Sequence, residues 1–280
     1  MKRVHLLPNI VTAFALSCGL FAIFKVNMMS AAAVNEHSLM VIAGLLLLAA
    51  FADLLDGAIA RAIKAESMFG GLFDCLADAI TFGVTPSIIV LKTLSPEPGT
   101  ASSFFLTAAA MIYSVCGVLR LVRFSLMAQK AKEDQSLADA HNKHFTGLPI
   151  PGGAVAAVAA NLAFMSGEFQ DFFDVRGLFH TWAMILIMVV LGYCMISRWK
   201  FPSLKTLNFR VASFRRVFIT VMAAVLLFYG LLNHFTIVFF FCSWGYILIA
   251  AVLSLIRLIS GKKSKTLEEF EPEPNDDIQE

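Results

Sequence analysis

Four aspartates stand close together in an otherwise apolar stretch of the chain, DLLDGAIARAIKAESMFGGLFDCLAD at residues 53–78. Asp53 and Asp56 are three residues apart and Asp74 and Asp78 are four apart, so each pair shares one face of a helix. The segment between the pairs is short enough to make the two helices antiparallel neighbours. The four carboxylates are therefore expected to converge on one site.

A cation must lie among these carboxylates. Ionised aspartates near hydrocarbon cost roughly a few kcal/mol each, and four of them also repel one another. Carboxylate oxygens without nearby histidine or thiolate are typical ligands of hard divalent ions such as Mg²⁺ or Mn²⁺, which keep positions for water and phosphate. An alternative is that the aspartates cap helix ends or pair with Arg61 and Lys64. Capping accounts for one or two aspartates, but not for four at regular spacing.

The small residues around the aspartates indicate a bulky ligand. Gly57, Gly70 and Gly71 would let such a ligand approach the backbone closely. Arg61, one turn beyond Gly57, offers a guanidinium suited to phosphate. Divalent ions, glycines and an arginine together indicate a substrate that carries a diphosphate.

Apolar helices must position these residues. Hydrophobic residues make up 58% of the 280 and charged residues 15%, which excludes an ordinary soluble domain. A helix of about 20 apolar residues spans a bilayer, and the segments of alternating polarity that are typical of a β-barrel do not appear. We expect an all-α polytopic membrane protein with about eight transmembrane helices, at residues 10–28, 38–58, 72–91, 103–124, 151–167, 178–196, 216–233 and 236–257.

The distribution of lysine and arginine predicts the orientation. Of 22 such residues, only Lys25, Lys92 and Arg176 fall on the side opposite the N-terminus. By the positive-inside bias, both termini and the aspartate-bearing turn are cytoplasmic. Lys2 and Arg3 before an apolar run could also open a cleavable signal peptide, but seven further spans favour an uncleaved first helix.

Outside the aspartate cluster the sequence offers few other sites. The net charge of +2 gives no indication of nucleic acid once the basic residues are explained by topology. The cysteines are scattered singly and are interpreted as packing residues, at Cys18, Cys75, Cys116, Cys194 and Cys242. His141 and His144 are expected in a solvated loop. We expect one transmembrane domain at residues 1–260 and a polar, disordered tail at 261–280.

The aspartate segment reads Asp53-x2-Asp56-Gly57-x2-Ala60-Arg61-x8-Gly70-x3-Asp74-x3-Asp78, which resembles the full signature of the CDP-alcohol phosphatidyltransferase family. Members of that family transfer a phosphatidyl or related group from a CDP-linked lipid or alcohol to an acceptor hydroxyl and release CMP. The resemblance implies that Asp53, Asp56 and Asp74 hold metal ions, and that Asp78 belongs to the same metal site and is also the general base on the acceptor hydroxyl. It also implies that Gly57 and Ala60 leave space for the cytidine nucleotide. In the same pattern, Arg61 contacts phosphate and Gly70 keeps the third helix close.

Three further stretches have counterparts, in similar order, in bacterial and archaeal-type members that use serine as the acceptor. They are LLPNIVTAFALSCGLFAIF at 6–24, LRLVRFS at 119–125 and FTGLPIPGGA at 145–154. The resemblance covers roughly residues 6–155 and extends to the count of eight helices. It implies CDP-diacylglycerol and L-serine as substrates, a bacterial-type inner membrane with the active site facing the cytoplasm, and a homodimer.

The chain departs from the family pattern in two of these stretches. It has VRFS at 122–125 where the family more often has ARFN, and GLPIPGG at 147–153 where the family has GLPSPAA. These positions lie in the region expected to set acceptor specificity. Glycerol 3-phosphate and an inositol phosphate therefore stay open as acceptors beside serine.

Arg120 and Arg123 share one face at the cytoplasmic end of the helix expected at 103–124, level with the aspartates. They are candidates to hold the serine carboxylate or a lipid phosphate, or else they are ordinary charges at a helix end. Gly147 and Pro149 belong to a stiff turn that either edges the pocket or punctuates a loop.

Two functions of other classes were weighed against the enzyme. A divalent-cation channel or transporter accounts for the carboxylates but leaves the neighbouring glycine and arginine without a role. A non-catalytic lipid-binding scaffold does not need the intact set of acidic residues. The sequence therefore favours the transferase.

Overall fold

The computed structural model describes residues 6–30, 33–63, 67–133, 145–172, 177–197, 200–201, 230 and 233–259. The helices are α1 (Leu6–Met28), α2 (Glu36–Ala62), α3 (Met68–Asp78), α4 (Thr85–Leu94), α5 (Ala101–Glu133), α7 (Ile150–Met165), α8 (Gly167–Phe172), α9 (Leu178–Ile196) and α11 (Phe235–Ile259), with a π-helical turn, η2 (Ala79–Val84), between α3 and α4. Two short strands, β1 (Phe145–Thr146) and β2 (Lys200–Phe201), pair antiparallel. Apart from this pair the described residues form no strand, so the predicted all-α class is confirmed.

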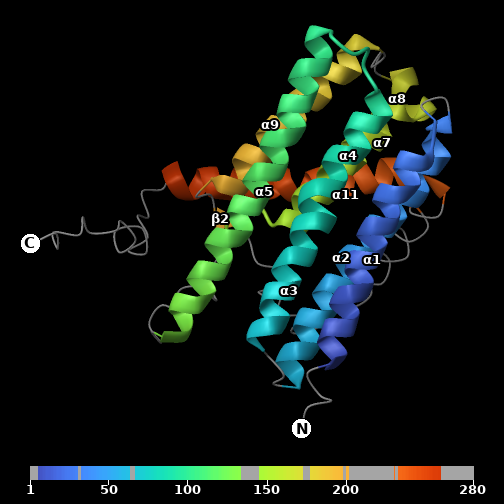
Figure 1. Cartoon of the computed structure of the whole chain (residues 1–280). Coiled ribbons are helices and arrows are strands. Elements are labelled where there is room, and N and C mark those ends of the chain that lie inside the picture. Colours follow the sequence, from blue (N-terminus) through green and yellow to red (C-terminus); the bar gives the residue numbers. More distant parts are fainter. Residues whose placement is uncertain are drawn as a thin grey trace, which may run out of the picture.

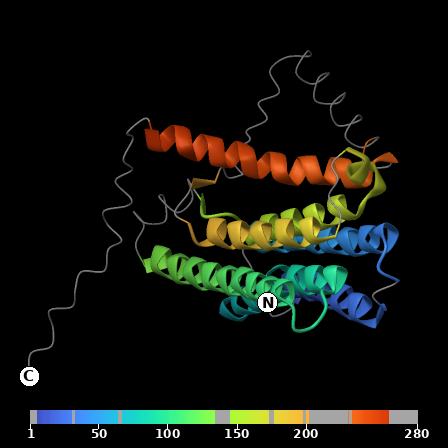
Figure 2. The ribbon, with the colours of Figure 1, turned by 90° about the horizontal axis from the view of Figure 1, so that it is seen from above.

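The upright helices form two layers, with α11 crossing behind them (Figures 1 and 2). One layer contains α1, the continuous rod α3–η2–α4, and α5, while the second contains α2, α7 and α9. Between the layers α1 packs along α2 and α5 packs along α9. Because α1 also packs against α3, both aspartate-bearing helices lie against α1.

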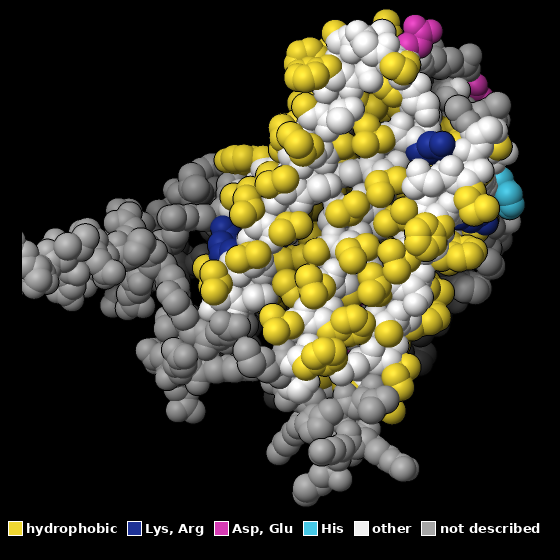
Figure 3. Space-filling model, in the orientation of Figure 1, with side chains coloured by type: hydrophobic (Ala, Val, Ile, Leu, Met, Phe, Trp, Pro, Cys, Tyr) yellow, Lys and Arg dark blue, Asp and Glu magenta, His cyan; other side chains and the backbone are white. Residues whose placement is uncertain are grey.

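Six helices are long and apolar enough to cross a membrane by length and composition, at Leu7–Met28, Glu36–Ala60, Phe69–Leu94, Ala101–Met127, Leu178–Ile196 and Phe235–Val252. Large apolar side chains on them are exposed, including Phe21 (57%), Phe104 (70%) and Leu186 (65%). Figure 3 shows hydrophobic side chains over most of the described face. An apolar surface of this extent is unusual for a soluble monomer, whereas lipid accommodates it. These features indicate an integral membrane protein.

The six spans match six of the eight expected helices to within about five residues at each end. The helix expected at 151–167 corresponds to α7, which has 16 residues and is too short for a full span. The helix expected at 216–233 lies almost entirely outside the described residues, and so does the tail at 261–280. The count of eight helices, the orientation and the limits of the domain therefore stay predictions.

The short helix α7 lies at the centre of the protein. Its small residues, among them Gly153, Ala157 and Ala160, are fully buried, and it packs against α2, α4, α9 and α11. Small residues let neighbouring helix backbones approach closely. On the α11 side, the Trp244 indole N–H donates to the Ala156 carbonyl at 3.1 Å.

The expected span at 103–124 is confirmed to within three residues as Ala101–Met127, but the helix α5 itself continues to Glu133. The residues after Met127 read AQKAKE, which are mostly strong helix formers despite their polarity. The helix therefore extends beyond its apolar span. Arg120 and Arg123 consequently lie inside a helix and not at its end.

The turn η2 follows directly after Asp78 and was not predicted. The Thr85 N–H donates to the Ile80 carbonyl, five residues back, which defines the π-helical geometry. Pro86 has no N–H to give the Phe82 carbonyl four residues back. The hydroxyl of Tyr113, in α5, donates to that carbonyl at 3.1 Å. A buried hydrogen bond from α5 thus compensates for the proline.

We expect Gly19→Ala to destabilise the protein. A Cβ at Gly19 would lie 2.6–2.9 Å from the Oγ1, Cγ2 and Cβ atoms of Thr81, a buried residue of η2. Overpacking of this kind costs about 1–3 kcal/mol. Thermal unfolding in detergent measures the loss, and Gly44→Ala in α2, where a Cβ meets nothing within 4 Å, is the matched control. Equal melting temperatures for the two variants would contradict the proposed close contact.

Candidate metal and substrate site

The four predicted aspartates lie together. One carboxylate oxygen from each of Asp53, Asp56 and Asp74 is within 4.8 Å of the others. Asp78, at the end of α3, lies within hydrogen-bonding reach of the Asp53 side chain. Two helices that are separate in the sequence thus bring all four carboxylates to one place, as the spacing predicted.

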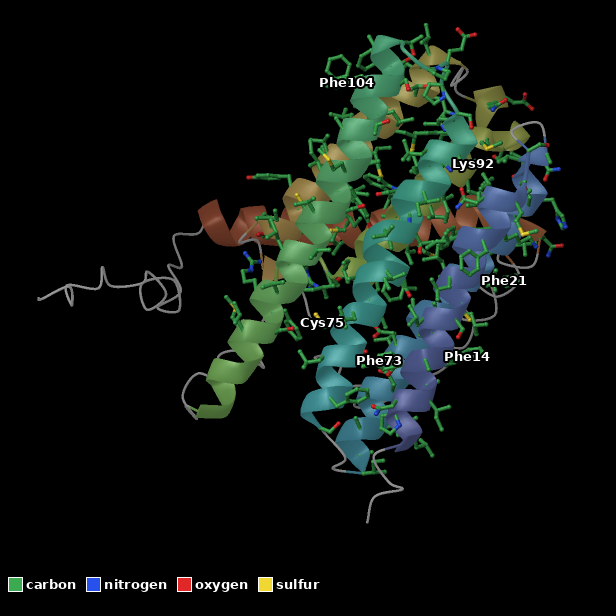
Figure 4. The ribbon with its side chains drawn as sticks, viewed as in Figure 1. Phe14, Phe21, Phe73, Cys75, Lys92 and Phe104 are labelled. Carbon is green, nitrogen blue, oxygen red and sulfur yellow. The ribbon has the colours of Figure 1, made fainter. Side chains whose placement is uncertain are left out.

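The cluster lies toward one end of the bundle. In Figure 4, Phe73 and Cys75 mark its level on α3, and Lys92 lies far along the same rod, toward the opposite end. Cys75 is on the side of α3 that faces α5, and the Ser125 hydroxyl of α5 lies 3.5 Å from its Sγ. The aspartates and Lys92 therefore lie toward opposite ends of the bundle. The predicted orientation likewise requires the aspartates and Lys92 to be on opposite sides of the membrane.

The arrangement fits a hard divalent cation. Asp56 is 4% exposed, and Oδ1 of Asp74 is buried without a hydrogen-bond partner among the described residues. An unsatisfied buried polar atom costs about 1–3 kcal/mol, and more if it is charged. Three carboxylate oxygens so close together, with no sulfur or imidazole in the cluster, form the ligand set that Mg²⁺ and Mn²⁺ prefer.

The alternative of helix capping does not describe these aspartates. The first turn of α3 is capped by Ser67, whose hydroxyl accepts a hydrogen bond from the Gly70 N–H at 3.0 Å. Asp78 precedes η2 but makes no side-chain cap hydrogen bond to it. Asp53 and Asp56 lie well inside α2.

The glycines of the signature differ in their surroundings. A Cβ at Gly57 would meet nothing within 4 Å, so the backbone of α2 beside Asp56 borders open space. At Gly70 a Cβ would lie 2.9 Å from Oδ1 of Asn9, which shows that α3 approaches α1 closely there. Ala60 is half-buried, one turn beyond Gly57. Arg61 lies near the end of α2, and its side chain is outside the described part of the chain.

Thr12 of α1, for which no role was predicted, contacts the cluster directly. Its hydroxyl lies 2.6 Å from Oδ2 of Asp56 and is buried. The available signal was a hydroxyl side chain within the apolar run LLPNIVTAF, a stretch already noted for its resemblance to the family.

The two candidate arginines have different surroundings. Arg120 is 8% exposed, interacts electrostatically with Asp78 and with Tyr246 of α11, and keeps its Nε buried without a partner in the described ranges. Arg123 donates from Nη1 to the Ile196 carbonyl at 2.9 Å, at the end of α9. Arg120 thus faces the aspartates, while Arg123 binds the end of a neighbouring helix.

The turn that contains Gly147 and Pro149 is fixed to α9. Gly147 has a φ of +84°, and a Cβ there would lie 2.5 Å from the Met195 carbonyl, so glycine is required. The Leu148 N–H donates to the Cys194 carbonyl at 3.1 Å. Pro149 then caps the start of α7. The same turn lies beside Arg123, whose Nη2 would be 3.2 Å from a Cβ at Gly147.

A model of the CDP-alcohol phosphatidyltransferase family matches residues 5–194, well over half of the chain. The chain belongs to this family. The matched residues include the aspartate cluster and both arginines, whereas α11 and its Tyr246 lie beyond the match.

Curated relatives named CDP-diacylglycerol–serine O-phosphatidyltransferase are similar to this family member over most of its length. The protein from Mycobacterium leprae is 29% identical over 74% of the chain, and that from Helicobacter pylori (strain 26695) is 27% identical over 78%. The Bacillus subtilis protein is 29% identical over 72%. The aligned part spans 93% of the Bacillus protein and 81% of the Helicobacter protein, but only 61% of the Mycobacterium leprae protein.

We expect Asp74→Asn to weaken Mn²⁺ binding by at least about tenfold, because the amide removes a negative charge and one carboxylate oxygen from the cluster. Titration calorimetry of the purified protein in detergent measures the affinity. Asp171→Asn, an exposed aspartate on α8, is the control and should bind like the wild type. Unchanged affinity in Asp74→Asn would exclude this cluster as the metal site.

Proposed function

We propose that the chain transfers a phosphatidyl group from CDP-diacylglycerol to L-serine, giving phosphatidylserine and CMP, the reaction of a phosphatidylserine synthase. Membership of the family supports the transfer chemistry, and the names of the relatives support serine as the acceptor. The observation that carries the proposal is the convergence of three buried or half-buried carboxylates, with Asp78 at hydrogen-bonding reach beside them.

In the proposed reaction the serine hydroxyl oxygen attacks the phosphorus on the lipid side of the diphosphate. A new P–O bond forms, the P–O bond to CMP breaks, and CMP leaves with that electron pair. Asp53, Asp56 and Asp74 would hold Mg²⁺ or Mn²⁺, which supplies charge neutralisation for the diphosphate and the leaving group. The open space beside Gly57 favours passage of the nucleotide end of the substrate along α2.

Asp78 is proposed to accept the proton of the serine hydroxyl. Asp78 lies within hydrogen-bonding reach of Asp53, and the positive charge of Arg120 interacts with it electrostatically. A carboxylate between cations keeps low basicity, so correct placement of the hydroxyl contributes more than proton affinity. The turn η2 holds the backbone directly after Asp78.

Arg120 is the residue we propose to bind the serine carboxylate. Its side chain is buried, its Nε lacks a partner in the described structure, and it interacts with the proposed base. A guanidinium binds a carboxylate through two parallel hydrogen bonds, which also orients the acceptor. Arg123, Gly147 and Pro149 would support this pocket from the end of α9.

We propose a bacterial-type inner membrane as the location, with the active site and both termini toward the cytoplasm. The six apolar helices support insertion in a membrane, and the positions of lysine and arginine support this orientation. A homodimer is proposed from the family resemblance alone.

Release of CMP by the purified protein in mixed micelles tests the function. We expect release to require CDP-diacylglycerol, L-serine and Mg²⁺ or Mn²⁺ together. Glycerol 3-phosphate and an inositol phosphate are tested in the same assay, because Arg120 and Arg123 could also serve an anionic acceptor. Faster release with either of them than with serine would replace the acceptor and leave the transfer chemistry intact. Metal flux into proteoliposomes without CMP release would instead indicate a transporter.

Asp78→Asn is the matching variant for the chemical step. It should abolish CMP release while CDP-diacylglycerol still binds, because the amide cannot accept the proton. Turnover that survives this substitution would overturn the assignment of the base.

We expect Arg120→Lys to raise the KM for serine by about tenfold or more and to leave the KM for CDP-diacylglycerol unchanged. Lysine keeps the charge but loses the paired geometry of the guanidinium. Arg123→Lys is the comparison. It should lower the melting temperature, since Arg123 binds the Ile196 carbonyl, and it should change the KM for serine less than Arg120→Lys does. A KM for serine that changes only in Arg123→Lys would reverse the two roles.

A further inference from the structure

Helix α1 contributes a polar contact to the carboxylate cluster from outside the aspartate signature. The Thr12 hydroxyl and Oδ2 of Asp56 are 2.6 Å apart, and each residue is 4% exposed. A distance of this size is typical of a hydroxyl that donates to an ionised carboxylate, which is stronger than a neutral hydrogen bond. The bond joins helices whose residues are 44 apart in the sequence.

The Thr12 hydroxyl has two possible acceptors within hydrogen-bonding distance. The Pro8 carbonyl, one turn earlier in α1, lies 3.1 Å from the Thr12 Oγ1. A threonine hydroxyl has one proton, and the shorter distance and the negative charge both favour the carboxylate. With its proton on the side of Asp56, the hydroxyl does not donate to the Pro8 carbonyl.

On both sides of Thr12, α1 makes close contacts with neighbouring elements in which a side chain lies against a glycine. On one side Asn9 lies against Gly70 of α3, where a Cβ would come within 2.9 Å of its Oδ1. On the other side Gly19 lies against Thr81 of η2, where even a methyl group would not fit. Thr12 therefore lies between two points at which α1 approaches its neighbouring elements closely.

We propose that Thr12 is a positioning residue that fixes the Asp56 carboxylate for divalent-cation binding. This inference rests on the proposed function, in which Asp56 is a metal ligand. Aspartates that repel one another tend to rotate apart, and a donor on one of them opposes that rotation. Hydrogen bonds to metal-binding carboxylates commonly change metal affinity by 10- to 100-fold.

The test measures Mn²⁺ affinity by calorimetry in the full-length protein, without substrate. Thr12→Val keeps the shape of the side chain and removes the donor, so we expect Mn²⁺ affinity to fall by about tenfold or more. Thr12→Ser keeps the hydroxyl and should stay within about threefold of the wild type. Thr12→Ala replaces Thr12→Val in this comparison if the valine variant is not recovered folded.

Ser17→Ala is the matched control on the same helix. Among the described residues the Ser17 hydroxyl bonds only within its own helix, at the Ala13 carbonyl 2.7 Å away, and Ser17 is exposed. Its loss should leave Mn²⁺ affinity unchanged. Wild-type affinity in Thr12→Val, or an equal loss in Thr12→Ser and Thr12→Val, would overturn the inference.

The outcomes separate this inference from the proposed function. If the wild-type protein itself does not bind Mn²⁺ and does not release CMP, the proposed function fails. If the wild type binds the ion and releases CMP but the Thr12 variants bind equally well, only the role of Thr12 fails.

Discussion

Mutual repulsion among four carboxylates in apolar helices is the constraint on which the rest of the structure depends. Each carboxylate placed near hydrocarbon costs roughly a few kcal/mol, and crowding of like charges adds to that cost. Packing must therefore hold α2 and α3 together against this repulsion. Helix α1 does so, because it packs along both of them and contacts α2 at Asp56 and α3 at Gly70, one turn before Asp74. Burial of an Asp74 oxygen that has no hydrogen-bond partner among the described residues adds to this cost, and a cation in the cluster would relieve it.

The central position of α7 follows from the same requirement. Helices can lie close together only if the side chains between them are small. The buried alanines and glycines of α7 meet this condition. Its position also connects α11, through the Trp244 bond, to the helices that carry the site. Helices built of small residues need not be long or strongly apolar when protein surrounds them on every side.

The sequence was sufficient to predict the aspartate cluster because helix periodicity fixes which residues share a face. Asp53 with Asp56, and Asp74 with Asp78, could be placed on common faces from their spacing alone, and six apolar spans were equally legible. The contact between Thr12 and Asp56 could not be predicted, because it depends on how α1 rotates against α2. Arg123 illustrates the same limit, since its bond to Ile196 joins residues 73 apart in the sequence. The full length of α5 was not predicted for another reason: apolarity marks the membrane span and not the helix, and AQKAKE continues the helix beyond that span.

The π-helical turn links the two halves of the site in a way that spacing rules do not capture. Pro86 has no N–H to donate to the Phe82 carbonyl, four residues back, so this carbonyl can accept from a donor outside the helix. The donor is Tyr113, two turns before Arg120 on α5. The helix that carries Arg120 is thus bonded to the segment that follows Asp78. A shift of α5 would move the arginine and the carboxylate together, so the distance between the proposed acceptor-binding group and the proposed base is held by a buried hydrogen bond and not by loop geometry.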